Sequence, residues 1–195
     1  MTKGEKRKQE LLKIAYRMFC TKGYDATSVD DIIEEAGIAK GTYYYYFASK
    51  EDMLEEVIGM MIENMAEKAR LVQEQDLSVA EKFFGTIMAF RPDETELTIG
   101  DALHRPENIV MHEKTNEKIM ACAVPLVSKI VEQAVAEGIA SCEDIELRVK
   151  MILLVGNSLF DGTDNPETEV RVFIELIEKL LNTKPGALAF VKQIL

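Results

Sequence analysis

The chain of 195 residues is acidic, with 23 Lys and Arg against 34 Asp and Glu, and 47% of its residues are hydrophobic. This composition excludes a disordered chain, and 11 Gly with 5 Pro are too few for a turn-rich β-sandwich or barrel. Three cysteines at no metal-like spacing indicate a reduced, cytosolic protein. We expect no signal peptide and no membrane-spanning segment, because no apolar run approaches the ~18 residues that a span needs.

The charge is unevenly distributed along the chain. Residues 1–52 hold nine basic and nine acidic residues, whereas residues 53–195 hold 14 basic and 25 acidic residues and carry the whole net charge of −11. The sequence therefore predicts a neutral N-terminal unit joined to an acidic body.

Three short helices are predicted near the N-terminus. Apolar residues between 11 and 19 recur at intervals of three and four, and the helix they predict ends near Gly23. The same spacing predicts a second helix that Thr27 or Ser28 caps and Gly37 ends. The third helical stretch, Lys40–Phe47, follows after a few residues. Two short helices joined by a glycine turn and braced by another helix are typical of a helix-turn-helix.

The rest of the chain is also predicted to be helical. A capping-box-like pattern at Ser49 opens a long helix that runs to about Gln75. Pro125 is expected to kink or divide a later helix, and Asn165-Pro166 provides a cap and first residue for the last long one. The further predicted helices cover residues 78–90, 94–104, 108–138, 142–160 and 167–182. We therefore predict an all-α fold.

The third helix contains four consecutive tyrosines, residues 43–46. Successive side chains of a helix step about 100° around its axis, so four neighbours sweep roughly 300° and cannot all enter one core. A phenol combines an apolar ring with a hydroxyl that can donate to a phosphate oxygen. Some of these rings are therefore expected to meet solvent or a partner.

Residues 7–54 resemble the DNA-binding domain of the TetR family of bacterial transcriptional regulators. The residues that carry the resemblance are Ala15, Phe19, Gly23-Tyr24, Thr27-Ser28-Val29, Ile32, Ala36-Gly37-Ile38, Lys40-Gly41-Thr42, Tyr44, Phe47 and Ser49-Lys50-Glu51. The resemblance implies that Lys40–Tyr46 is a recognition helix in the major groove, with Tyr43 and Phe47 in the core. The positions it implies for DNA contacts are Thr27, Ser28, Lys40, Gly41, Thr42, Tyr44, Tyr45, Tyr46 and Lys50.

Asp30 departs from this family, whose members often carry Arg or another polar residue near the start of the second helix. A carboxylate cannot bond a phosphate. Two roles stay open for the Asp30 carboxylate. It can accept from a cytosine amine or, as the simpler interpretation, it supplies a negative charge at the N-terminus of the helix.

Apolar residues cover two faces of each of the last two long helices, over residues 149–160 and 170–181. One face can be buried in the body while the other needs a partner; two wholly buried helices are the alternative. The resemblance implies dimerisation through these helices in a four-helix bundle. The expected interface residues are Met151, Leu154, Val155, Val170, Phe173, Ile174, Ile177 and Leu181.

Methionines and phenylalanines are frequent in the middle helices, where the resemblance implies an effector pocket. Such side chains adapt to irregular apolar ligands, although ordinary core packing explains any one of them equally well. The expected pocket residues are Met61, Met65, Phe84, Met88, Met111, Met120, Asn157 and Phe160. We expect no cofactor and no metal, because His104 and His112 lie eight residues apart with Pro106 between them.

Together these features predict a helix-turn-helix domain over residues 1–50 and an effector-binding and dimerisation domain over residues 51–195. The expected protein is a cytoplasmic, nucleoid-associated homodimeric repressor that a small apolar or amphipathic molecule releases from a near-palindromic operator. The alternative is a DNA-binding protein of the same fold that a protein partner controls. No motif of a hydrolase, phosphate-binding loop or metalloenzyme is present, so we do not expect an enzyme.

Overall fold

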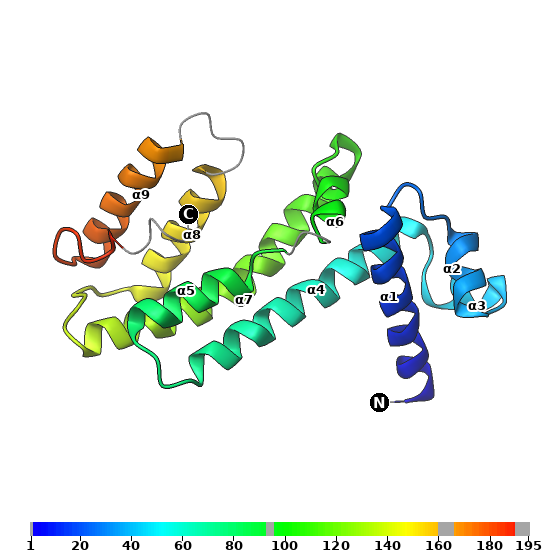
Figure 1. Ribbon diagram of the computed structural model, residues 1–195, viewed down its shortest axis with the longest axis horizontal. Helices are drawn as coiled ribbons and strands as arrows, with labels where there is room; N and C mark the ends of the chain where they lie inside the picture. Colours follow the sequence, from blue (N-terminus) through cyan, green and yellow to red (C-terminus); the bar gives the residue numbers. More distant parts are fainter. Residues whose placement is uncertain (1, 93–95, 160–165, 190–195) are drawn as a thin grey trace. The chain divides into compact units, whose positions relative to one another are not determined.

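The computed structural model describes residues 2–92, 96–159 and 166–189, and within these ranges it is helical without any strand (Figure 1). The all-α prediction is therefore confirmed. The elements are α1 (Lys3–Lys22), α2 (Val29–Ala36), α3 (Lys40–Tyr46), α4 (Lys50–Gln73), α5 (Val79–Ala89), α6 (Leu97–Leu103), the 3₁₀ turn η1 (Pro106–Asn108), α7 (Ile109–Ala136), α8 (Ile145–Leu159) and α9 (Pro166–Leu181).

Pro125, expected to kink or divide its helix, lies inside α7, which runs from Ile109 to Ala136, so the helix is not divided. Proline removes one backbone donor, and the other hydrogen bonds of a 28-residue helix keep the element together. Helix α7 is also long and apolar enough to cross a membrane by length and composition alone. Its residues Val124, Val127 and Val131 belong to a buried core, which identifies α7 as a core helix.

The chain forms two compact units, and each contains two separate stretches of sequence. The first unit holds residues 1–63 and 92–118, and the second holds residues 64–91 and 119–195. Helices α4 and α7 each begin in the first unit and end in the second. The predicted boundary at residue 50 separates two functional domains and not two compact units, and it stays a prediction.

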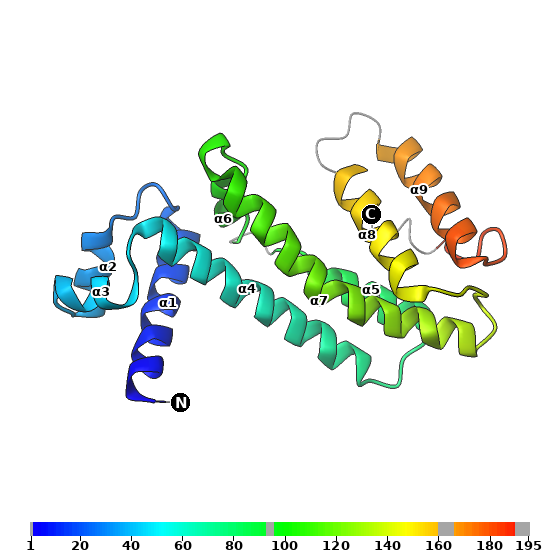
Figure 2. The same ribbon diagram turned by 180° about the vertical axis from the view of Figure 1, so that it is seen from behind.

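The core of the first unit joins α1, α2, α3 and the start of α4. Leu11 and Phe19 of α1, Ile32 of α2, Tyr43 of α3 and Phe47 are all at most 1% exposed. Helices α2 and α3 lie close together beside α1 in both views of the ribbon (Figures 1 and 2). These contacts fix α3 on its neighbours.

Helix α6 also belongs to the first unit and is tied to α1. The hydroxyl of Thr98 donates to the backbone carbonyl of Phe19 at 3.1 Å, and the hydroxyl of Tyr16 donates to the Glu96 carboxylate at 3.0 Å. These bonds join segments about 80 residues apart in the sequence.

The core of the second unit joins α7, α8 and α9, with α5 packed against it. Val127 and Val131 of α7, Val149 of α8, and Phe173 and Ile177 of α9 are all at most 6% exposed. Helices α8 and α9 lie side by side in both views (Figures 1 and 2). The apolar faces of these helices therefore meet within one chain.

Gly85 permits a close approach between α4 and α5 in the second unit. A Cβ atom at this position would lie 2.8 Å from Cγ1 of Val72. Because valine has little rotamer freedom in a helix, Val72 cannot easily turn away. The missing side chain at residue 85 is thus a packing requirement.

We expect Gly85→Ala to lower the melting temperature, because overpacking of ~1–3 kcal/mol outweighs the ~1 kcal/mol gain in helix propensity. Thermal unfolding followed by circular dichroism measures the effect, and Val72→Ala in the same chain should restore stability. Gly100→Ala is the matched control, since a Cβ in α6 meets nothing within 4 Å. A Gly85→Ala protein as stable as the wild type would contradict the packing argument.

Candidate nucleic-acid interface

The turn between α2 and α3 depends on Gly37. This residue adopts the left-handed conformation with φ 60° and ψ 41°, in which glycine avoids the strain of a side chain. The amide of the next residue, Ile38, donates to the carbonyl of Ile33 at 3.2 Å and closes α2. The chain can then start α3 only two residues later.

Ser28 caps α2, and Thr27 is buried. The Ser28 hydroxyl accepts from the Asp31 amide at 3.1 Å, while the Asp31 carboxylate accepts from the Ser28 amide at 2.9 Å. The Thr27 side chain is fully buried and donates to the carbonyl of Gly23 at 2.8 Å. Thr27 therefore has no side-chain atom left for DNA, and its expected contact is corrected to a structural role.

Tyr43 anchors α3 in the first unit. Its ring is 0% exposed, lies 5.7 Å from the ring of Phe47 between centroids, and its hydroxyl donates to the Ser49 carbonyl at 3.1 Å. Burial raises the pKa of the Tyr43 phenol to about 12. Tyr43 and Phe47 thus occupy the core positions that the sequence predicted.

The three other tyrosines of α3 are open to solvent to different degrees. Tyr45 is 81% exposed and Tyr44 49%, while Tyr46 is partly buried, its ring 4.9 Å from that of Tyr45. A Cβ at Gly4 would lie 3.7 Å from the Tyr46 hydroxyl, so this hydroxyl lies beside the first turn of α1. Sequence reasoning did not include that turn in the site, because the pairing of α1 with α3 is set by tertiary packing.

The two lysines predicted to contact DNA already have partners in the folded chain. Lys40, the first residue of α3, lies 3.1 Å from the Asp30 carboxylate of α2. The Lys50 ammonium lies over the Tyr24 ring, 4.1 Å from its centroid, and burial lowers the pKa of Lys50. Each of the two lysines therefore has a partner within the chain.

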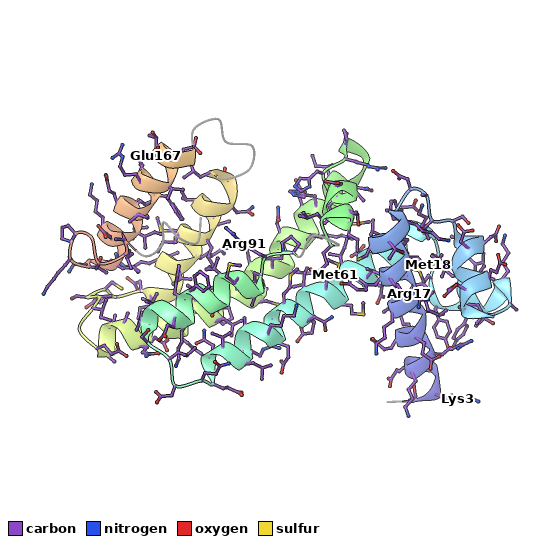
Figure 3. All side chains as sticks on the ribbon, in the orientation of Figure 1. Lys3, Arg17, Met18, Met61, Arg91 and Glu167 are labelled. Carbon is purple, nitrogen blue, oxygen red and sulfur yellow. The ribbon has the colours of Figure 1, made fainter. Side chains whose placement is uncertain are left out.

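Other basic residues of this unit form ion pairs between or within helices. Arg7 pairs with Glu10 at 2.8 Å, Lys8 pairs with Glu56 at 2.7 Å, and Arg17 pairs with Glu35. Figure 3 labels Lys3 at the N-terminal end of α1. These pairs place a carboxylate beside each of the three cations, which lowers the positive charge that the unit offers to an anion.

The eight expected dimer residues separate into two groups. Phe173, Ile174, Ile177 and Leu181 are at most 7% exposed within the single chain, so they retain little surface for a partner. Val170 is partly buried. Met151, Leu154 and Val155 of α8 are 40–50% exposed. The sequence could not distinguish the inner from the outer apolar face, and the three α8 residues are the expected interface residues that stay exposed in the single chain.

The eight expected pocket residues do not share one environment. Met61 and Met65 are buried, Met111 and Met120 are partly buried, and Phe84, Met88 and Asn157 are exposed. Phe160 lies outside the described residues. A separate apolar cavity of about 40 Å³ lies in the second unit, and none of the expected residues lines it. Its lining residues are Val79, Phe83, Ile130, Val131, Ala134, Ile139, Ala140, Ile177, Leu181, Thr183 and Leu188.

His104 and His112 lie next to each other in the first unit, with ring centroids 5.1 Å apart. The turn at η1 folds α7 back beside α6, so their separation of eight residues did not keep them apart. Within the described residues, no group of three or more His, Cys, Asp or Glu side chains gathers to hold a metal ion.

Residues 11–57 match the family described as bacterial regulatory proteins, tetR family. Over 83 residues the chain is 39% identical to the HTH-type transcriptional repressor KstR2 of Mycolicibacterium smegmatis, covering 43% of this chain and 40% of that protein. The chain thus spans less than half the length of the KstR2 proteins it matches. A longer match of 28% identity covers 73% of the chain and 76% of the fatty acid metabolism regulator protein of Bacillus subtilis.

Solved structures share the whole fold. A transcriptional regulator of the TetR/AcrR family from Thermobifida fusca aligns with a TM-score of 0.57 at 23% identity, covering 91% of this chain and 97% of that one. GusR of Salmonella enterica aligns with a TM-score of 0.57 at 19% identity, covering 93% and 98%. The helical arrangement is therefore one that other proteins adopt at low sequence identity.

We expect Tyr43→Phe to lose about 1 kcal/mol of stability at neutral pH, because the Ser49 carbonyl loses the phenolic donor and keeps only the Met53 amide, at 3.3 Å. The raised pKa means that the unfolded chain releases this phenolic proton first, so stability falls as the pH rises from about 10 to 12. In the variant this loss of stability with rising pH should be smaller. It should not vanish, because burial also raises the pKa values of Tyr16 and Tyr24. Urea denaturation at several pH values measures both effects, and Tyr45→Phe, at an 81% exposed position, should change neither.

Proposed function

We propose that the chain is a DNA-binding repressor, because residues 11–57 match the TetR family of bacterial regulatory proteins, whose members are transcriptional regulators and not enzymes. In this proposal the protein acts as a homodimer in the cytoplasm, on the nucleoid, and a small apolar or amphipathic molecule releases it from its operator. The observation that carries the proposal is the exposed aromatic face of α3, which the buried Tyr43 anchors.

The exposed residues of α3 suit the major groove. The Tyr44 hydroxyl can donate to a phosphate oxygen, and the ring of Tyr45 can contact bases or a thymine methyl. Thr42 is partly buried and Gly41 is exposed, so the backbone of this turn can approach DNA closely. Tyr46, beside the first turn of α1, is proposed to bond a phosphate there.

A homodimer would compensate for the weak electrostatic attraction between one neutral unit and DNA. Phosphate contacts by cations supply most non-specific affinity, and a neutral unit has little of it. Two linked units would bind an operator with two half-sites far more tightly than one. Leu147, Met151 and Leu154 form an exposed apolar row on α8, with fractions of 47–60%, which a second copy could cover.

The proposed effector is an apolar chain with one polar end. The relative whose match extends into the body is named a fatty acid metabolism regulator, which agrees with the Met- and Phe-rich composition of this region. A ligand lowers operator affinity only if it binds one conformation of the dimer better than the other. The residues Met65, Met88 and Met120 remain proposed contacts of that ligand.

We expect the full-length protein to select a near-palindrome whose half-site centres lie about 34 Å apart or a little more. Tyr44→Phe should weaken binding about fivefold without changing the preferred sequence, because a phosphate bond is lost. Lys50→Ala should weaken binding and reduce the slope of log affinity against log salt by about one. Selection from a random library, followed by gel shifts, measures these effects. Unchanged affinity in either variant would exclude the phosphate contact of that residue.

Leu154→Glu should convert the dimer to a monomer, since a buried unpaired carboxylate at a subunit interface costs several kcal/mol. Sedimentation velocity at micromolar concentration measures the change. Glu146→Lys, an exposed charge change on the same helix, is the control and should leave the dimer intact. A monomeric wild type would contradict the proposed assembly.

Saturated fatty acids of increasing length should lower operator affinity and raise the melting temperature of the free protein, with the effect growing with chain length. Acetate, which has the same headgroup and almost no chain, is the matched control. Fluorescence anisotropy of labelled operator DNA and thermal unfolding measure the two effects. If long-chain acids change neither quantity, the fatty-acid class of effector is wrong for this protein.

A further inference from the structure

Asp30 and Lys40 face each other across the helix-turn-helix. Lys40 Nζ lies 3.1 Å from Asp30 Oδ1, and the two side chains are 64% and 76% exposed. An ion pair this open to water stabilises a fold very little. The pair therefore has no evident structural purpose.

The simpler role for Asp30, a charge that caps α2, is already filled. Ser28 and Asp31 form the capping box of this helix, with each side chain bonded to the other's backbone amide. The Asp30 carboxylate instead reaches α3 and bonds Lys40. Its place in the first turn of α2 is favourable for a negative charge, but its hydrogen bond serves the recognition helix.

The pair lies on the exposed side of α3. Lys40 and Tyr44 are four residues apart on one helix and therefore share a face. Tyr44 is 49% exposed, and its phenol contributes to the raised pKa of Lys40, which the Asp30 carboxylate causes in the first place. Asp30 thus adds a hydrogen-bond acceptor to a surface that otherwise offers donors and aromatic rings.

A neighbouring donor and acceptor can meet either kind of base pair, because adenine also presents an acceptor, N7, beside the donor N6 amine. An ammonium favours guanine, whose two acceptors lie side by side. In the major groove guanine presents two acceptors, O6 and N7, and cytosine presents the donor N4 amine. An ammonium can donate to the guanine while the carboxylate accepts from a cytosine. The carboxylate also repels phosphates and the acceptors of thymine, so it penalises other sequences.

We propose that Asp30 is a specificity-determining residue that, together with Lys40, reads a G·C pair in each half-site. Asp30 accepts from the cytosine N4 amine and holds Lys40 toward guanine O6 and N7. This inference rests on the proposed DNA-binding function and adds which base is read and by which acidic group. The proposal also accounts for the neutral charge of the unit, because the Asp30 carboxylate lowers the affinity for all DNA and raises the selectivity for a G·C pair.

The test compares sequences selected by the full-length wild type and its variants from a random DNA library, with affinities then measured by anisotropy. Asp30→Ala should lower discrimination for cytosine at one position per half-site by about tenfold or more, while affinity for unrelated DNA rises. Asp30→Asn should admit adenine at that position, because an amide pairs with adenine N6 and N7. Thermal unfolding of each variant verifies that it folds.

Glu34→Gln is the matched control, since it removes an exposed negative charge from the same helix. It should raise affinity slightly for all DNA and leave the selected sequence unchanged. If Asp30→Ala behaves like this control, Asp30 acts only as a charge and the proposal is overturned. A wild type that selects no sequence would instead remove the proposed function itself, and the two failures are therefore distinguishable.

Discussion

The candidate DNA-binding surface depends on the burial of one phenol. Tyr43 places its ring beside Phe47 and its hydroxyl on the Ser49 carbonyl, so it ties α3 both to the core and to the start of α4. Helix α3 has only seven residues, too few to be stable without tertiary contacts. Once Tyr43 is fixed, the 100° step of the helix turns Tyr44 and Tyr45 outward. The exposed rings thus follow geometrically from the buried one.

Charge pairing within the first unit is the second constraint. Arg7, Lys8 and Arg17 are each bonded to a glutamate, and Lys40 is bonded to Asp30. Such pairing limits general attraction to the DNA backbone, which grows with the number of cations that contact phosphates. In the proposed function, such a surface would select DNA through hydrogen bonds, ring contacts and the linkage of two half-sites. The low charge available to DNA follows from the pairing of these cations within the chain.

In the second unit, α8 and α9 bury apolar residues against helices of the same chain. The bulky residues of α9 pack on α7 and α8, and Gly156 lets Phe173 approach so closely that a Cβ would lie 2.9 Å from its ring. The exposed apolar row of α8, Leu147, Met151 and Leu154, is the surface left for the proposed second copy. Burial within the chain thus decides which of two similar apolar faces stays available for assembly.

The sequence by itself determined the helices and their main boundaries, because glycine turns, capping residues and apolar spacing act over a few residues. The resemblance of residues 7–54 to a known DNA-binding domain implied that Tyr43 and Phe47 lie in the core, and both are buried. Contacts between distant segments are different, because they depend on which faces meet. Only the tertiary structure decided that Thr27 is internal, that Lys40 is held by Asp30, that His104 and His112 are neighbours, and that Phe173 and Ile177 face inward. The physical reason is that the pattern of one helix records that a face is apolar, whereas the packing of several helices determines what covers that face.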